Sequence, residues 1–336
     1  MKNVAIIGAG LQGKRRLPPI LADKNYKATW IIDRDIDKAK NLASLCQAKY
    51  GTDWKEATND KNVDVVLVLT YNDSHAAITI DALNNGKHVL CEKPLARTEK
   101  EAKDMVTLAK KQKRILKCGF NHRHHPAILE AYKFLKDNHM GKILFGRGLY
   151  GIAGREGIEK EWRSDPSIVS GGQLMEQGIH LVDLFRWFLG EINSVTGMVH
   201  TNYWPIKPLE DNGFAILQTE KGVMATIHSS LTQWINLFEF EIYGEKAYFK
   251  VQGLGGAYGN EKLIYGIKEP DKPFSYQTIE YRGGDTSWTK EWQEFTAAID
   301  SKKEPIGNGL DGLKAMQIVN AVYASSKTGK KIELKV

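Results

Sequence analysis

Short apolar runs alternate with polar, helix-patterned segments along the first part of the chain. The run at 63–70 is nearly all apolar and β-branched, which is typical of a strand buried on both faces of a parallel sheet. We therefore predict a parallel sheet whose strands are joined by right-handed helical crossovers. The expected strands cover 4–7, 29–32, 63–70, 88–91 and 115–118, and the expected helices cover 11–23, 37–49, 74–84 and 98–112. Pro18 and Pro19 should bend or interrupt the first helix.

The pattern changes after residue 121, where strand-like runs follow one another without intervening helices. Such a succession predicts a largely antiparallel sheet. Strands are expected at 143–150, 194–203, 212–219, 223–231, 238–243 and 247–251, and helices at 125–138, 171–189, 288–299 and 310–326. Near the end, Trp288, Trp292, Phe295 and Ile299 recur at helical spacing and are interpreted as core packing.

Composition excludes several classes of protein. Hydrophobic residues make up 42% of the 336 residues, which is enough for two packed cores and excludes a disordered chain. No apolar run approaches the roughly 20 residues that a membrane span needs. Met1-Lys2-Asn3 leads straight into the first expected strand, so no signal peptide and a cytoplasmic location are expected. The 3 cysteines form no CxxC pair and are expected to be free thiols.

The net charge of +7 suits an anionic ligand such as a dinucleotide or a nucleotide-sugar. Nucleic acid would also attract a positive chain, but the lysines are scattered along helical segments. Proteins that bind nucleic acid usually cluster positive charge on one face. We therefore expect no nucleic-acid partner and no membrane partner.

The segment Gly8-Ala9-Gly10-Leu11-Gln12-Gly13 is a GxGxxG motif between an apolar strand and a helix. In this context Gly8 permits a tight turn, Gly10 lets the backbone approach a pyrophosphate, and Gly13 lets the helix pack closely on the strand. The N-terminus of the helix offers free N–H groups to the phosphates. We interpret the motif, including Leu11 and Gln12, as a dinucleotide-binding loop.

Asp33 follows the second expected strand, about 20 residues after the glycine motif, where a carboxylate binds the adenosine ribose of NAD. A carboxylate at this place would repel the 2′-phosphate of NADP. Arg34 could pair with that phosphate, so NAD is favoured and NADP stays open.

Motifs along the whole chain resemble those of the glucose–fructose oxidoreductase and inositol dehydrogenase (Gfo/Idh/MocA) family. Glu92-Lys93-Pro94 resembles its EKP motif. The other segments that carry the resemblance are Thr70-Tyr71-Asn72-Asp73-Ser74-His75, Gly119-Phe120-Asn121-His122-Arg123, Trp162-Arg163, the stretch 171–184 and the late turn Tyr243-Gly244-Glu245-Lys246. In the stretch 171–184, Glu176 stands where the family usually has aspartate, and Tyr71 stands where it usually has proline.

The resemblance implies an α/β protein with two domains. A Rossmann domain with a doubly wound parallel sheet, residues 1–121, would bind NAD(P). A C-terminal α+β domain with a large, mostly antiparallel open sheet, residues 122–336, would bind substrate and form a homodimer or homotetramer; its last helix could pack back on the first domain. Cofactor contacts are expected from Thr70, Tyr71, Asn72, His75, Glu92, Lys93, Asn121, Trp162 and Arg163, and substrate contacts from Lys93, Arg123, Trp162, Arg163, Glu176 and His180.

The expected chemistry is oxidation of a secondary alcohol, or reduction of the ketone, on a sugar, nucleotide-sugar or cyclitol. Oxidation leaves a proton for a base within hydrogen-bond reach. Lysine can act as that base where burial and a neighbouring cation lower its pKa, and Lys93 follows a parallel strand at the sheet edge that binds ligands. His180 is a second candidate acceptor. Glu176, four residues earlier, would lie on the same helical face and orient His180 or the substrate.

Other roles stay open for some of these residues. Tyr71 could stack on the cofactor or simply pack, His75 could cap or pack in its helix, and Asp183 could serve substrate or helix. His122, His124 and His125 do not have the spacing of common zinc sites, so no required metal is expected.

Two alternatives to a simple dehydrogenase remain. One is an enzyme that keeps NAD tightly bound and recycles it, either between two sugars or during oxidation and elimination of a glycoside. The other is a non-catalytic dinucleotide sensor. A sensor would not require Lys93 and His180 together, which disfavours it.

Overall fold

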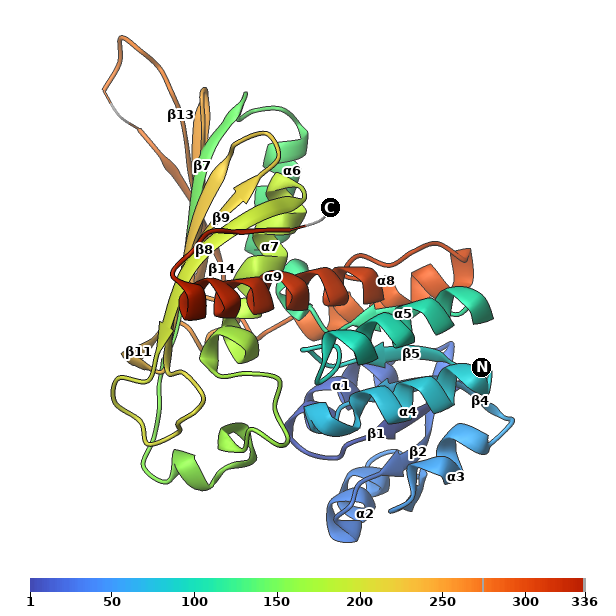
Figure 1. Cartoon of the computed structure of the whole chain (residues 1–336). Coiled ribbons are helices and arrows are strands. Elements are labelled where there is room, and N and C mark those ends of the chain that lie inside the picture. Colours follow the sequence, from blue (N-terminus) through green and yellow to red (C-terminus); the bar gives the residue numbers. More distant parts are fainter. Residues whose placement is uncertain (274, 335–336) are drawn as a thin grey trace. The chain divides into compact units, whose positions relative to one another are not determined.

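The computed structural model describes residues 1–273 and 275–334, which form two compact units (Figure 1). The first unit comprises Met1–Asn121 together with Trp288–Leu313. The second comprises His122–Ser287 and the segment that begins at Lys314. None of the helices in the described part of the chain is both long and apolar enough to cross a membrane.

The first unit is built on a six-stranded parallel sheet in the order β3-β2-β1-β4-β5-β6. This is the doubly wound order, in which the chain leaves β1 in both directions and creates a switch point between β1 and β4. The strands are β1 Lys2–Ile7, β2 Tyr26–Ile32, β3 Lys49–Gly51, β4 Val63–Val68, β5 His88–Cys91 and β6 Leu116–Cys118. The predicted Rossmann sheet is therefore confirmed.

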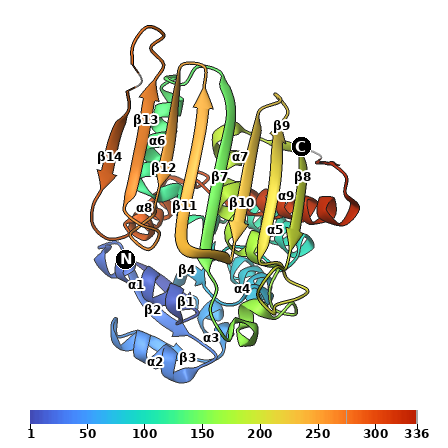
Figure 2. The same ribbon diagram turned by 90° about the vertical axis from the view of Figure 1, so that its left-hand side faces the viewer.

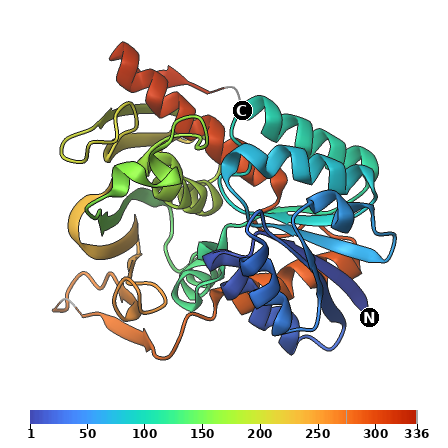
Figure 3. The ribbon, with the colours of Figure 1, turned by 90° about the horizontal axis from the view of Figure 1, so that it is seen from below.

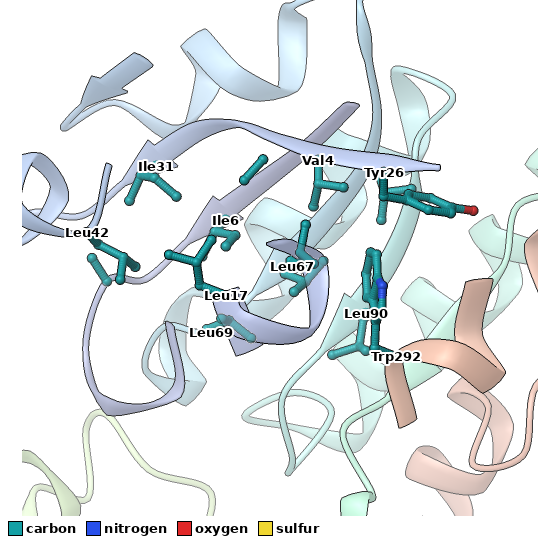
Figure 4. Close-up of a cluster of buried hydrophobic side chains, with 14 of the residues drawn as sticks. Val4, Ile6, Leu17, Tyr26, Ile31, Leu42, Leu67, Leu69, Leu90 and Trp292 are labelled. Carbon is teal, nitrogen blue, oxygen red and sulfur yellow. The ribbon is translucent and has the colours of Figure 1, made fainter. Parts of the chain in front are cut away.

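Helices cover both faces of this sheet (Figure 3). They are α1 Leu11–Ala22, α2 Ile36–Ser44, α3 Trp54–Asn59, α4 Asn72–Asn84, α5 Glu99–Gln112 and α8 Ser287–Ser301. On one face, side chains of α1, α2 and α8 pack with the strands into one core (Figure 4). There Trp292 meets Tyr26 edge to face at 5.1 Å, and its indole N–H donates to Asp23 at 2.9 Å.

Two expectations for the first unit differ from the structure in part. Pro18 and Pro19, expected to bend or interrupt the first helix, lie inside α1 without interrupting it, so the helix runs from Leu11 to Ala22. The segment Trp288–Leu313 lies within the expected second domain 122–336, for which packing back of the last helix on the first domain was allowed; it belongs to the first unit, because Trp292, Phe295 and Ile299 fill its core. The last long helix, α9 Gly309–Thr328, starts in the first unit and continues in the second.

The second unit is built on a nine-stranded sheet in the order β14-β13-β12-β11-β7-β10-β9-β8-β15 (Figure 2). Strands β7 and β10 pair in parallel, and the other described pairs are antiparallel, as predicted. The strands are β7 Ile143–Ala153, β8 Ile192–His200, β9 Asn212–Thr219, β10 Met224–Ser230, β11 Thr232–Gly244, β12 Ala247–Gln252, β13 Glu261–Ile267, β14 Gln277–Tyr281 and β15 Ile332–Glu333.

One face of this sheet carries α6 Pro126–Lys136 and α7 Ile179–Leu189. Helix α7 lies very close to β7 because β7 has glycines at the contact. A Cβ at Gly146 would lie 2.6 Å from the Phe185 ring, and one at Gly148 would lie 2.9 Å from Leu181. This close packing fixes the helix that carries His180.

Candidate functional site

The glycine motif forms the turn between β1 and α1. Gly8 has φ +111°, and a Cβ there would lie 2.5 Å from the Leu69 carbonyl oxygen. A Cβ at Gly13 would lie 2.5 Å from the Gly8 carbonyl oxygen. A Cβ at Gly10 would meet no atom within 4 Å. Gly8 and Gly13 are therefore required by the fold itself, whereas Gly10 leaves open space beside the backbone.

That open space fits a dinucleotide. The N-terminus of α1 begins directly after Gly10, so its amide groups can bind phosphate oxygens. Gln12 adds a second indication, because its Oε1 is buried and has no hydrogen-bond partner among the described residues. A buried acceptor without a donor is rare and calls for one from a ligand or water. Leu11 is 61% exposed and offers its backbone and side chain to a ligand.

Asp33 lies beside this loop, at the end of β2. Its Oδ2 accepts from the Ala9 amide at 2.7 Å, and its Oδ1 accepts from the Asp35 amide at 3.0 Å. Each carboxylate oxygen can accept a further hydrogen bond, so Asp33 can also bind a ribose diol. The neighbouring Arg34 guanidinium lies 4.9 Å from the centre of the Tyr71 ring. The structure thus brings Asp33, Arg34 and Tyr71 to the carboxyl edge of the sheet, at its switch point.

A buried ion network lies under the Glu92-Lys93-Pro94 turn. Arg16 of α1 donates from Nε and Nη2 to Glu92 Oε1 at 2.8 and 2.6 Å, and from Nη1 to Glu291 of α8 at 2.7 Å. Burial raises the pKa of Glu291 against the opposing effect of Arg16. The Lys93 amide donates to Glu92 Oε2 at 3.3 Å. The Glu92 carboxylate therefore anchors the turn that presents Lys93.

His75 joins this turn to the loop after β4. Its Nδ1 faces the Pro94 carbonyl at 3.0 Å, and its Nε2 faces the Thr70 carbonyl at 3.1 Å. Only the doubly protonated ring can donate to both oxygens. Burial alone would lower its pKa, but the Cys91 thiol and these two carbonyls raise the pKa of His75 to about 9. His75 is fully buried, so the geometry supports a role in joining two loops. Asn72 and Asn121 are also buried, at 2% and 5% exposure.

In the second unit, Glu176 lies in a π-helical turn, Leu174–Gly178, that leads directly into α7. Such π turns are frequent at functional sites. His180 is 4% exposed, and the His122 ring stacks on it with centroids 3.7 Å apart. His122 Nε2 lies 3.2 Å from the hydroxyl of Tyr150 on β7. The pair His180 and His122 therefore rests on a buried aromatic and polar cluster.

Two predicted substrate residues are engaged by other side chains. Arg123 donates from Nε and Nη2 to the two oxygens of Asp183 at 2.7 and 2.6 Å, and both side chains are buried. This pair identifies Asp183 as the partner of Arg123. Arg163 is half exposed, lies 3.9 Å from Glu176 and covers the Trp162 ring at 4.3 Å.

The His122 and His125 rings meet edge to face at 5.6 Å and each has a further partner. His122 stacks on His180, whereas His125 pairs with Glu261 at 2.9 Å. Within residues 1–273 and 275–334, no group of three or more His, Cys, Asp or Glu side chains is arranged to hold a metal ion.

Sequence reasoning missed several residues that hold the site. Arg16 and Glu291 carry no local signal, because they are far apart in the chain and meet only in the fold. Tyr150 ends the expected strand 143–150, where its side chain fits the strand pattern and gives no separate indication of a site. His122 stands in both the Gly119-Phe120-Asn121-His122-Arg123 segment and the histidine cluster, but neither pattern assigned it a role in the site.

Comparisons with known proteins match both halves of the chain. Residues 2–120 match the family described as "Oxidoreductase family, NAD-binding Rossmann fold", and residues 128–250 match the "GFO/IDH/MocA C-terminal domain". A levoglucosan dehydrogenase from Pseudarthrobacter phenanthrenivorans is 32% identical over 231 residues, or 66% of this chain and 59% of that protein. Inositol 2-dehydrogenase 2 from Saccharopolyspora erythraea is 27% identical over 67% of this chain and 65% of that protein.

The chain thus matches less than two thirds of the length of either relative. Among solved structures, a levoglucosan dehydrogenase in complex with NADH and levoglucosan superposes with a TM-score of 0.91 at 22% identity, covering 99% of both chains. At that identity the likeness concerns the fold, which is the same over the whole length. From these matches and its own motifs, the chain belongs to the Gfo/Idh/MocA family of oxidoreductases with an NAD-binding Rossmann domain.

Proposed function

We propose that this protein is a dehydrogenase that transfers a hydride between NAD and a secondary alcohol or ketone of a cyclic polyol, either a sugar derivative or a cyclitol. The observation that carries the proposal is the Asp33 carboxylate, held by the Ala9 amide beside the open space at Gly10. The named substrates of the relatives, levoglucosan and inositol, are both cyclic polyols.

The cofactor preference follows from charge. Asp33 can accept hydrogen bonds from both hydroxyls of an adenosine ribose, and its charge opposes a 2′-phosphate. Arg34 is the group that could reverse this preference, because a guanidinium binds phosphate in a bidentate manner. Its position over the Tyr71 ring supports a stacking role beside the adenine instead. NAD is therefore the proposed cofactor.

The proton of the reacting hydroxyl needs an acceptor. When bound, the nicotinamide would supply the hydride acceptor. Lys93 is the proposed base, supported by its place after β5 and by the anchoring of its turn through Glu92. His180, with Glu176, is the proposed substrate-binding group of the second unit and the alternative proton acceptor. Arg163 and Trp162 would contribute contacts to the polyol.

The two units would have different functions. We assign cofactor binding to the first unit, and substrate binding and subunit contacts to the second. The sheet of the second unit exposes large apolar side chains such as Met198, Phe214, Ile216 and Met224. Exposed apolar groups in such number often mark an interface, which supports a homodimer or homotetramer.

Calorimetric titration with NADH and with NADPH tests the cofactor assignment, after any co-purified nucleotide has been removed. We expect NADH to bind more tightly, and Asp33→Ala to lower NADH affinity about tenfold or more, since a charge-assisted hydrogen bond contributes about 1.5–3 kcal/mol. Asp37→Ala, a nearby carboxylate in the first turn of α2, is the control and should bind as the wild type. If neither nucleotide binds the stripped, folded protein, the enzyme assignment fails.

Turnover on a panel of cyclic polyols then tests the base. Lys93→Ala should still bind NADH and lose about 100-fold or more in kcat, the usual contribution of a general base. Lys100→Ala, an exposed lysine of α5, is the matched control. If the Lys93→Ala enzyme had wild-type kcat, Lys93 would not be the base and His180 would become the candidate.

A further inference from the structure

Glu210, in the loop between β8 and β9, contacts the segment that precedes Glu176 and His180. Its carbonyl oxygen accepts from the Gln173 amide at 3.0 Å. Its side chain accepts from the Gly172 amide at 3.1 Å through Oε2 and from the Leu174 amide at 2.9 Å through Oε1. One residue therefore binds the amide groups of three consecutive residues at the start of the helical segment.

Amide groups at the start of a helix lack partners within the helix and carry partial positive charge. Glu210 supplies these partners although it comes from a distant part of the chain. The approach is so close that a Cβ at Gly172 would lie 2.4 Å from the carboxylate. Only glycine at residue 172 permits this contact, which gives a physical reason for the second glycine of the GGQLMEQG stretch.

A side-chain hydroxyl also donates to this carboxylate. The hydroxyl of Tyr323 on α9 donates to Glu210 Oε1 at 2.8 Å. Glu210 is only 6% exposed, and burial raises its pKa against the effect of these donors. Burial and the Glu210 charge likewise raise the pKa of Tyr323. The two groups thus form a coupled buried pair.

The pair borders a pocket of about 680 Å³, so protons from solvent can reach it. His200 and Lys207 line the same pocket and are the other titratable groups that face it. The neighbouring Asp211 points elsewhere, because its carboxylate accepts from the amides of Asn202, Tyr203 and Trp204. Of these two neighbouring carboxylates, Glu210 is therefore the one that lines the pocket.

We propose that Glu210 is a positioning residue, whose ionised carboxylate holds the segment 172–174 and thereby places Glu176 and His180 for the reaction. The inference rests on the proposed function. An ionised carboxylate only accepts hydrogen bonds, and the Gly172 amide, the Leu174 amide and the Tyr323 hydroxyl each donate to it. Protonation removes the charge that strengthens these hydrogen bonds, so the neutral carboxyl holds the segment more weakly. A small displacement of a reacting group can reduce turnover about 100-fold, so activity should fall with acidification.

The test is the pH dependence of kcat/KM in Tyr323→Phe. Removing a donor from the carboxylate disfavours its charged form, so the acid limb should move to higher pH. The plateau at higher pH should stay within about threefold of the wild type, because the amide contacts remain. Tyr265→Phe is the control, since this hydroxyl donates to Gln277 at the exposed edge of the sheet. A merely structural Tyr323 would change stability without moving the acid limb.

Glu210→Gln gives a second test, because its side-chain NH2 cannot accept from an amide. It should lower kcat about tenfold or more at every pH and leave NADH binding unchanged. Hydrogen exchange of the peptide 172–180 provides a readout that needs no substrate. The protection of this peptide should decrease when the pH is lowered far enough to protonate Glu210. In Tyr323→Phe the same decrease should occur at a higher pH. An exchange profile and an acid limb that are the same in wild type and Tyr323→Phe would overturn the proposal. Absence of turnover in the wild type would instead count against the proposed function.

Discussion

The two units hold their functional residues in different ways. In the first, the glycine loop, Asp33 and the Glu92-Lys93-Pro94 turn each lie directly after a strand of the parallel sheet, so the preceding strand places each of them. In the second, His180 stacks on His122, and the segment that carries it is capped by Glu210. The comparison shows that the candidate residues of the first unit take their places from the order of its strands, whereas this polar cluster depends on contacts between separate segments.

Both units also contain a buried arginine that pairs with carboxylate groups. The two arginines should differ in how much stability is lost when each is removed. Arg16 pairs with two carboxylates, Glu291 on α8 and Glu92 at the end of β5, whereas Arg123 pairs with Asp183 through two hydrogen bonds. An arginine between two buried carboxylates prevents the repulsion between them as well as pairing with each. Removing Arg16 should therefore cost more than removing Arg123.

Substitution of these arginines gives the largest expected effect. Arg16→Met leaves two buried carboxylates without their arginine and should lower the free energy of unfolding by about 5 kcal/mol or more, the upper end for a broken buried pair. Arg123→Met removes the arginine that pairs with Asp183 and should cost about 3 kcal/mol. Calorimetric melting measures both. Arg15 is exposed and, like Arg16, lies near the Trp288 ring. Arg15→Met is therefore the control and should change stability little. Equal costs for the two buried arginines would contradict the comparison.

The glycine loop permits a smaller and more selective test. A methyl group at Gly10 meets no protein atom, so Gly10→Ala should keep its melting temperature and lose NADH affinity about tenfold or more, because the methyl fills the space of the pyrophosphate. Gly13→Ala collides with the Gly8 carbonyl and should cost about 1–3 kcal/mol of stability as well. Melting and NADH titration of both variants separate the effects. A Gly10→Ala protein that binds NADH normally would place the pyrophosphate elsewhere.

His88 at the start of β5 gives the smallest effect, through acid pH. Burial and the nearby Arg114 lower the pKa of His88 to about 4, and its Nδ1 accepts from the Ile115 amide at 3.0 Å. The folded state therefore binds fewer protons than the unfolded one. Its stabilisation is complete above about pH 6.5 and declines as the pH falls towards 4.

His88→Gln keeps an acceptor for the Ile115 amide and removes the titration. Unfolding by urea at pH 7 and pH 5 should show that the wild type loses about 1 kcal/mol more than the variant on acidification, after allowance for solvent screening of this partly exposed ring. The same loss in both proteins would mean that His88 titrates normally.

The periodicity of the chain was sufficient to predict most of the first unit. Buried parallel strands such as β4 have a continuous apolar pattern, and the glycine motif locates the first turn. The short elements β3 and α3 were not predicted, because three to six residues carry too little periodic pattern. Strands β13 and β14 were not predicted either. Strand β14 is largely exposed and has no buried face to alternate with a polar one.

The candidate site was predictable where it depends on motifs and not where it depends on distant contacts. Asp33 and Lys93 stand at fixed places after strands, so spacing alone indicates them. The side chains that hold the candidate site residues are distant in sequence. Arg16 pairs with Glu92, His122 stacks on His180, and Glu210 binds the segment before Glu176; these contacts form only when the chain folds. No local pattern distinguishes a charged residue that will be buried in an ion network from one on the surface.

The doubly donating ring of His75 makes one junction of the first unit insensitive to pH. With a pKa of about 9, His75 keeps its proton across the range in which an ordinary histidine titrates. It therefore donates to the Pro94 and Thr70 carbonyls throughout that range. The loop after β4 and the turn that presents Lys93 stay joined in mildly acidic and in mildly basic solution, so a pH dependence of turnover is expected to originate elsewhere.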